Sequence, residues 1–246
     1  MTLCTPIRTR HDGGDPVENA PSSFAPLHPY TLAMPASGAT ATARNGADRR
    51  PLSIGLMGGS FNPAHDGHRH VAELALKRLA LDEVWWLVSP QNPLKPRDGM
   101  ASFAERLASA RAMARHPRIK PTDIEMRLGT HFTADTLVEL RRRCPRMRFV
   151  WIMGADNLID FHRWERWSLI LHTTVIAVFD RPSYSLRALA SRVARRYAKV
   201  RVPYRASRTL VGRRPPAWVF LHTPRHSASA TRIREARDMG HAPKKG

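Results

Sequence analysis

The chain has 246 residues, a net charge of +20 and 42% hydrophobic residues. This is enough apolar material for one large domain or two small ones. No apolar run approaches the ~18 residues that a transmembrane helix needs, and the N-terminus lacks the basic start and apolar core of a secretory signal. The two cysteines, Cys4 and Cys144, show no metal-ligand spacing, so we expect a cytoplasmic protein in a reducing compartment.

The positive charge is concentrated towards the C-terminal end. Residues 181–246 hold 17 Lys and Arg against 2 Asp and Glu. Such a segment attracts nucleic acid or anionic substrates. An RNA-binding protein would interleave aromatic platforms with its arginines, and no recognisable RNA-binding motif occurs here. A solvated, arginine-rich surface accounts for the composition equally well, so nucleic acid is the less favoured partner.

Residues 1–50 are rich in Pro, Ala, Ser, Thr and Gly and show no strand or helix periodicity. We expect a disordered N-terminal extension there, followed by a single domain over 51–246. Strands are predicted at 53–57, 83–89, 118–124, 147–153, 173–179 and 218–222, and helices at 67–80, 102–115, 133–143, 164–171, 185–199 and 231–239. Ser102 and Glu105 form a capping box, and Thr133 is the expected N-cap of its helix.

The alternation of strands and helices predicts an α/β fold with a doubly wound parallel sheet, of the Rossmann-like kind. In such sheets ligands bind beyond the C-terminal ends of the strands, at a topological switch point. The chemically informative segments all follow predicted strands or precede helices, and we expect them at that edge.

The stretch Gly55–His68 reads GLMGGSFNPAHDGH and joins the first strand to the first helix. Glycines let the backbone approach an anion, and the N–H groups of a helix start favour negative charge. His65 and His68 lie about one turn apart, so both rings can face one phosphate. The spacing excludes a Walker A loop and the Gly-x-Gly-x-x-Gly fingerprint. The simpler alternative is a glycine turn with two surface histidines.

The segment SASATRIR precedes the last predicted helix. Ser229 or Thr231 can cap that helix and leave N–H groups for a phosphate. Arg234 would offer a bidentate fork to phosphate oxygens. Taken alone, the pattern equally fits a purely structural cap.

The segment MGADNLIDFHRWERW follows the strong strand at 147–153. Asp156 can accept hydrogen bonds from a ribose or order the loop, and Trp164 offers a flat face for a heteroaromatic ring. Alternatively, Trp164 and Trp167 are two core aromatics, and we assign Trp167 to the core.

Two further segments suit a small anionic substrate. In GTHFTADTL, Thr130 and Thr133 bracket a helix start that could hold a carboxylate. In SPQNPLKPR, Lys95 is either a phosphate contact or a solvated loop lysine.

Together these segments resemble a known family. GGSFNPAHDGH resembles the nucleotidyltransferase signature that contains His-x-Gly-His, and its longer form is similar to that of bacterial nicotinate-nucleotide adenylyltransferases. Ser229, Thr231, Ile233 and Arg234 match the order of the family's second signature, Ile-Ser-Ser-Thr-x-Ile-Arg. The chain departs from it at Ala228 and Ala230, and Phe132 stands where the family usually has Tyr.

The resemblance implies transfer of the adenylyl group of ATP to nicotinate mononucleotide. It assigns His65, His68 and Arg234 as catalytic. It assigns ATP binding to Gly58, Gly59, Ser60, Phe61, His65, His68, Gly154, Asp156, Ser229, Thr231 and Arg234, and nicotinate-nucleotide binding to Lys95, Thr130, Thr133 and Trp164. Mg²⁺ is expected to arrive with ATP, mostly water-ligated and without a dedicated protein site. An enzyme of the same superfamily that acts on phosphopantetheine is the nearest alternative. The sequence leaves open whether the chain forms a homo-oligomer.

Overall fold

The computed structural model describes residues 50–90, 100–181 and 183–222. The predicted N-terminal extension, apart from Arg50, and the predicted last helix at 231–239 lie outside these ranges. Within them, no helix combines the length and the apolar character needed to cross a membrane.

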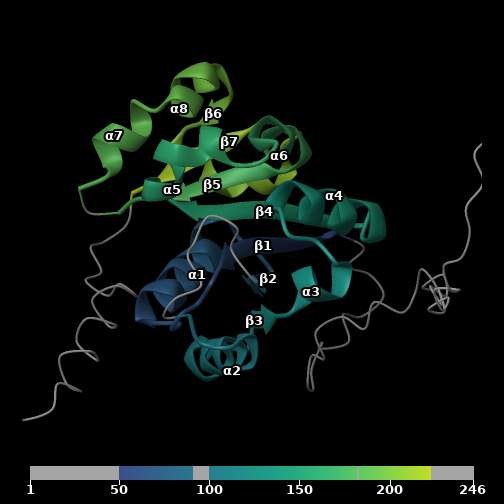
Figure 1. The fold of residues 1–246 in the computed structure, drawn as a ribbon. Helices are drawn as coiled ribbons and strands as arrows, with labels where there is room; N and C mark the ends of the chain where they lie inside the picture. Colours follow the sequence, from purple (N-terminus) through teal and green to yellow (C-terminus); the bar gives the residue numbers. More distant parts are fainter. Residues whose placement is uncertain (1–49, 91–99, 182, 223–246) are drawn as a thin grey trace, which may run out of the picture. The chain divides into compact units, whose positions relative to one another are not determined.

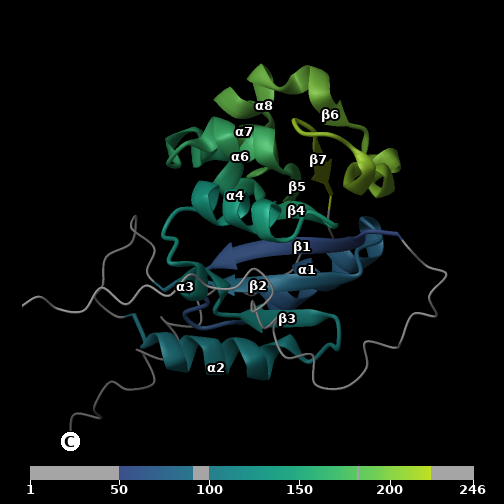
Figure 2. The same ribbon diagram turned by 90° about the vertical axis from the view of Figure 1, so that its right-hand side faces the viewer.

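A parallel sheet forms the centre of the described part of the chain (Figure 1). Its seven strands are β1 (Leu52–Gly59), β2 (Glu83–Val88), β3 (Ile119–Thr122), β4 (Met147–Gly154), β5 (Val175–Phe179), β6 (Arg201–Val202) and β7 (Trp218–Leu221). Their order is β3-β2-β1-β4-β5-β7-β6, and all pairings are parallel. Figure 2 shows this order from β3 at the bottom upwards. The predicted doubly wound α/β fold is confirmed.

The direction of winding reverses between β1 and β4. The chain runs outward from β1 through β2 to β3 and then returns to β4 on the other side of β1. Residues 52–57 of β1 pair in register with residues 147–152 of β4. Ligands of open α/β sheets bind at this kind of switch point, beyond the C-terminal strand ends.

Helices cover both faces of the sheet. They are α1 (Asp66–Arg78), α2 (Phe103–Ala114), α3 (Ile124–Leu128), α4 (Thr133–Arg143), α5 (Ala155–Asp160), α6 (Trp167–Thr173), α7 (Ser185–Leu189) and α8 (Arg192–Arg196), with short 3₁₀ turns η1 (Phe161–Arg163), η2 (Ala198–Val200) and η3 (Tyr204–Gly212). Residues of α1, α2 and η3 share one core cluster with Trp86 and Ile152. On the opposite face, Trp85 packs edge-to-face on Phe149.

The strands are apolar almost throughout because both faces of the sheet are covered. In β2 every residue after Glu83 is buried, and all five residues of β5 are buried. Adjacent tryptophans Trp85 and Trp86 point to opposite faces and are both buried. Removing so much apolar surface from water is the main stabilising contribution to this fold.

The predicted element boundaries hold to within a few residues at most positions. The capping box of α2 is confirmed, since Ser102 Oγ accepts from the Glu105 N–H at 3.3 Å and Glu105 Oε2 accepts from the Ser102 N–H at 2.8 Å. Thr133, in contrast, is the first residue of α4 and not its N-cap. Phe132 holds the cap position and provides no side-chain hydrogen bond.

Three predicted elements differ from the structure. The expected helix at 185–199 is divided into α7, α8 and η2, because Ser191 starts a new helix by accepting a hydrogen bond from the Ala194 N–H. The expected strand at 118–124 ends at Thr122, and α3 begins at Ile124. The expected helix at 164–171 begins only at Trp167.

Candidate active site

The candidate site lies at the C-terminal ends of β1 and β4, where the winding reverses. Gly58 and Gly59 end β1, and Gly154 ends β4. A Cβ on Gly58 would lie 2.6 Å from Cη2 of Trp151, so any larger residue displaces the indole of the neighbouring strand. Glycine is therefore required where β1 passes Trp151, and the backbone stays accessible at the strand end.

His65 and His68 form the cap of α1. His65 is the N-cap, and its Nδ1 accepts a hydrogen bond from the Gly67 N–H at 3.1 Å. Nδ1 of His68 accepts from the His65 N–H at 3.2 Å. The usual capping box has Ser or Thr at the N-cap and Glu or Gln at the third helical position. Here His65 and His68 occupy these two positions.

This arrangement determines which ring nitrogen carries a proton. A ring that accepts through Nδ1 has its hydrogen on Nε2 when it is neutral. The two ring centroids are 3.8 Å apart, at an interplanar angle of 33°. Both rings therefore hold an Nε2–H donor beside the first turn of α1, where the helix dipole favours an anion.

Phe61 supports His68 from within the core. It is 1% exposed, stacks on Trp86 with centroids 5.1 Å apart, and contacts the His68 ring at 4.8 Å. Its φ of 47° is in the left-handed region, which reverses the chain between β1 and α1. Since its side chain is buried, any contact of Phe61 with a nucleotide would come from its backbone.

Asp156 lies in the first turn of α5, directly after β4. Its Oδ2 accepts from Nη1 of Arg181 at 2.7 Å. Its Oδ1 is buried and has no hydrogen-bond partner among the described residues. A Cβ on Gly154 would collide with this Oδ1, so glycine at the strand end allows the carboxylate to turn back over it.

Trp164 stands at the end of η1, between β4 and α6. Its ring meets Trp151 and Phe161 edge-to-face, at centroid distances of 6.3 Å and 5.3 Å. The residue is half-buried, so neighbouring aromatics fix the ring while part of it stays exposed. Trp167 packs edge-to-face on Phe161 and Tyr197. It is only half-buried, as Trp164 is, so its predicted place in the buried core is not confirmed.

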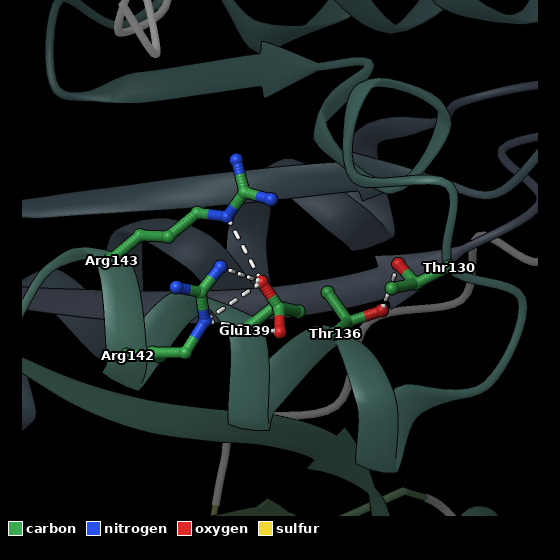
Figure 3. A network of polar contacts seen from close by, with 5 residues as sticks. All are labelled: Thr130, Thr136, Glu139, Arg142 and Arg143. Carbon is green, nitrogen blue, oxygen red and sulfur yellow. Dashed lines mark hydrogen bonds and ion pairs between the residues drawn. The ribbon is translucent and has the colours of Figure 1, made fainter. Parts of the chain in front are cut away.

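The Thr130–Thr136 turn leads into α4. Thr130 is 7% exposed, and its N–H donates to the Glu125 carbonyl at 3.0 Å. Its Oγ1 lies 2.8 Å from Oγ1 of Thr136 (Figure 3). Thr130 therefore fixes the turn from within. On the same helix, Glu139 pairs with Arg142 and Arg143, and these hydrogen bonds lower the pKa of the Glu139 carboxyl.

Thr133 occupies the first position of α4, where backbone N–H groups have no intrahelical acceptor. Phe132 provides no side-chain cap, and its carbonyl accepts from the N–H groups of Asp135 and Thr136, both at 3.1 Å. The helix itself therefore leaves the N–H groups of Thr133 and Ala134 as donors. An ion pair links this helix start to the loop of Trp164, since Nη2 of Arg166 lies 2.5 Å from Oδ1 of Asp135. This ion pair thus connects the start of α4 at Thr133 with the loop of Trp164, two of the parts predicted to bind the nicotinate nucleotide.

The sequence did not identify Arg166 and Arg181 as residues near the site, because the carboxylate that each one binds is distant in sequence. Arg166 pairs with Asp135, and Arg181 pairs with Asp156. Their only sequence signals of proximity to the site are their positions, two residues after Trp164 and two residues after the end of β5. The predicted ligands Lys95, Ser229, Thr231 and Arg234 lie outside the described residues.

Comparison with known proteins assigns the class. Residues 56–236 match the family model described as Cytidylyltransferase-like. The match begins within β1 and covers the glycine loop, the capped helix and the other strands of the sheet. The chain is therefore a cytidylyltransferase-like nucleotidyltransferase.

Relatives narrow the assignment. A Cereibacter sphaeroides protein named "Probable nicotinate-nucleotide adenylyltransferase" is 55% identical over 183 residues, which cover 74% of this chain and 97% of that protein. One of the same name from Rhizobium meliloti is 51% identical over 186 residues, covering 76% and 99%. The chain belongs to the nicotinate-nucleotide adenylyltransferase family, as its motifs indicated.

Solved structures agree on the fold. A structure titled as Plasmodium falciparum nicotinic acid mononucleotide adenylyltransferase complexed with NaAD aligns with a TM-score of 0.55 and 17% identity, over 75% of this chain and 83% of that chain. A second structure of that protein, complexed with APC, gives a TM-score of 0.51 and 16% identity over the same shares.

Proposed function

We propose that this chain transfers the adenylyl group of ATP to nicotinate mononucleotide, producing nicotinate adenine dinucleotide and pyrophosphate. The names of relatives at 50–55% identity support this choice of acceptor. The observation that carries the reaction type is the capped start of α1 at the β1–β4 switch, where two histidine rings lie 3.8 Å apart.

The reaction needs no covalent enzyme intermediate. A phosphate oxygen of nicotinate mononucleotide attacks the α-phosphorus of ATP in line, and a new P–O bond forms. The bond from the α-phosphorus to the oxygen that bridges to the β-phosphate breaks, and pyrophosphate leaves with that electron pair. Positioning of the two phosphates and stabilisation of the developing charge account for most of the catalysis in such transfers.

The histidine pair suits the phosphates of ATP. Each neutral ring holds its hydrogen on Nε2, and the first turn of α1 adds the positive end of a helix dipole. We assign His65 and His68 to the α- and β-phosphates, with His68 the residue that acts in the transition state. Gly58, Gly59, Ser60 and the backbone of Phe61 form the surrounding loop.

The nicotinate ring is assigned to the region between α4 and Trp164. Trp164 is held edge-to-face by two aromatic residues, so its face is fixed for stacking. The N-terminal donors of α4 at Thr133 suit the ring carboxylate, and Thr130 fixes that turn. The ion pair of Arg166 with Asp135 keeps the two parts in register.

Gly154 and Asp156 are assigned to the nucleoside of ATP. The buried Oδ1 of Asp156, which has no described partner, would accept a hydrogen bond from a ribose hydroxyl. Lys95, Ser229, Thr231 and Arg234 are proposed as further phosphate ligands on their motifs alone. Arg234 would bind the β- and γ-phosphates, and Lys95 the phosphate of the acceptor.

Mg²⁺ is the proposed metal, bound mainly by phosphate oxygens and water. Nucleotide-bound Mg²⁺ retains several waters and needs few protein ligands, so the described residues, which contain no cluster of three His, Cys, Asp or Glu, are compatible with it. The ion would neutralise charge on the transferring phosphates.

Pyrophosphate release from ATP tests the proposal, with nicotinate mononucleotide, nicotinamide mononucleotide and phosphopantetheine as separate acceptors. Release with the nicotinate compound at least about tenfold above the other two is expected, since a site built for a polar group discriminates strongly against its absence. Release only with phosphopantetheine would overturn the acceptor and leave the phosphate site intact. Absence of release with all three would overturn adenylyl transfer.

A further inference from the structure

Arg106 is a buried cation whose hydrogen bonds to described residues all go to backbone carbonyls, and its guanidinium also lies 5.5 Å from the centre of the Phe103 ring. It lies on α2, is 2% exposed, and donates from Nε to Ala101 O at 3.1 Å. Its Nη1 donates to Ser60 O at 2.8 Å and to Ser89 O at 2.7 Å, and its Nη2 donates to Pro90 O at 2.9 Å. No described Asp or Glu pairs with it.

The four carbonyls belong to segments that leave the sheet beside the candidate site. Ser60 follows β1 and begins the turn that leads to His65. Ser89 and Pro90 follow β2, and Ala101 precedes the N-cap of α2. One guanidinium group therefore joins the loop after β1 to the end of β2.

Two further hydrogen bonds lie at the same junction. The Ser89 N–H donates to Gly59 O at 2.9 Å, and the Ala101 N–H donates to Oδ1 of Asn62 at 3.3 Å. The loop that carries the histidine pair is thus attached to its neighbours at Gly59, Ser60 and Asn62. Of these attachments, only the one at Ser60 is made by a charged side chain.

Burying an arginine without a carboxylate partner costs free energy that an apolar side chain would not cost. Burial disfavours the charge and lowers the pKa of Arg106, and an apolar side chain of similar size often stabilises a core at least as well. The planar guanidinium, however, places several donors at fixed angles, which neither lysine nor an apolar residue can do. This geometry favours a role in positioning over a role in stability.

We propose that Arg106 is a positioning residue that sets the loop after β1, and through it His65 and His68, against the end of β2. The inference rests on the proposed adenylyl transfer. Loss of the guanidinium leaves four carbonyls without this donor and frees the loop to move. Since a displacement of about 1 Å in a catalytic group costs roughly 100-fold in rate, the loss falls mainly on kcat.

Arg106→Met tests this, with Arg111→Met as the matched control. Arg111 is on the same helix and is exposed, and it forms no ion pair with a described residue. We expect kcat of Arg106→Met to fall about 100-fold, with KM for nicotinate mononucleotide within about threefold of wild type. Arg106→Lys should fall similarly because an ammonium cannot reach all four carbonyls. Arg111→Met should match the wild type.

Two measurements separate positioning from folding. Arg106→Ala should regain at least about fivefold in kcat with millimolar guanidinium, which restores the planar donor, whereas Arg111→Met should not respond. Amide hydrogen exchange at Gly67 and Ser89 should quicken in folded Arg106→Met and stay unchanged in Arg111→Met. A folded Arg106→Met with wild-type kcat and exchange would overturn the proposal, as would a loss of kcat that only tracks the unfolded fraction.

The exchange experiment does not depend on the reaction. If the wild type released no pyrophosphate, the proposed function would fail while exchange at Gly67 and Ser89 still decided whether Arg106 positions the loop. Conversely, an active wild type with unchanged exchange and activity in Arg106→Met would remove the positioning role alone.

Discussion

His65 and His68 lie with their ring centroids 3.8 Å apart because each ring caps the same helix through its Nδ1 atom. The backbone bonds of the cap orient both rings, and Phe61 packs against the ring of His68. It also directs both Nε2 atoms away from the acceptor side of the cap. The same two side chains therefore cap α1 and form the proposed phosphate site.

The double role of His68 makes a variant comparison informative. His68→Glu keeps an acceptor of the kind found at this capping-box position and has no side-chain N–H donor. We expect it to retain more stability than His68→Ala, which loses a cap worth about 1 kcal/mol. Both variants should lose about 100-fold or more in kcat, because a charge-stabilising donor is gone.

Urea unfolding and steady-state pyrophosphate release measure the two effects separately. His65→Asp serves as the companion variant, because Asp is among the best N-cap residues and likewise has no side-chain N–H donor. Wild-type kcat in His68→Glu would mean that the ring acts only as a cap.

Gly58 is constrained by packing against Trp151. A Cβ there would lie 2.6 Å from Cη2 of the indole, and the indole is buried in the core. Gly58→Ala should therefore destabilise the fold by about 1–3 kcal/mol, the usual cost of overpacking. In Gly212→Ala the nearest atom would be a terminal guanidinium nitrogen of Arg148 at 3.6 Å, an ordinary contact.

The free energy of unfolding, measured in urea, should fall for Gly58→Ala and change by less than about 0.5 kcal/mol for exposed Gly212→Ala. Equal stability of the two variants would show that Trp151 moves aside at little cost.

Trp164 is the proposed stacking platform for the acceptor. Its removal in Trp164→Ala should raise KM for nicotinate mononucleotide about tenfold or more, given ~1–3 kcal/mol for stacking one base. KM for ATP should change much less, because the two histidines lie on a different element. Trp167→Phe is the control, since Trp167 packs on Phe161 and Tyr197.

Steady-state titration of each substrate against saturating partner gives both KM values. A rise in KM for ATP as large as that for the acceptor would place Trp164 elsewhere in the site.

Local sequence signals predicted the local features of this fold well. The near-continuous apolar runs of β2, β4 and β5 and the Ser102–Glu105 capping box were readable because each depends on residues close in sequence. The glycine and histidine motif was also readable, since strand, loop and helix follow in order. Its two histidines do lie together at the start of α1.

Long-range partners could not be read from the sequence. Arg106 resembles any helix arginine until the carbonyls of Ser60 and Ser89 are seen around it. The pairing of Asp156 with Arg181 spans 25 residues. The division of the expected helix at 185–199 depended on Ser191, whose hydroxyl competes for backbone donors as serine often does. The burial of Thr130 likewise follows from Thr136 and Glu125, which only the fold brings beside it.

Glu125 should make stability depend on pH. This α3 residue is 6% exposed, and burial raises the pKa of its carboxyl from 4.5 to about 7, partly offset by hydrogen bonds with Ser89 and Thr136. Between these two pH values the unfolded chain gives up the proton while the folded chain retains it. Stability from this group is thus complete below about pH 4.5 and is lost as the pH rises through about 7.

The loss amounts to roughly 3 kcal/mol at about 1.4 kcal/mol per pH unit. Glu125→Gln removes the titration and keeps a hydrogen-bonding amide, so wild type should lose stability relative to it from pH 5 to pH 8 in urea unfolding. Glu105→Gln is the control, because hydrogen bonds with Ser102 lower the pKa of Glu105, and that contribution is lost only in acid. A constant difference between wild type and Glu125→Gln across this range would mean that Glu125 is already ionised in the folded protein, with Ser89 and Thr136 compensating for its burial.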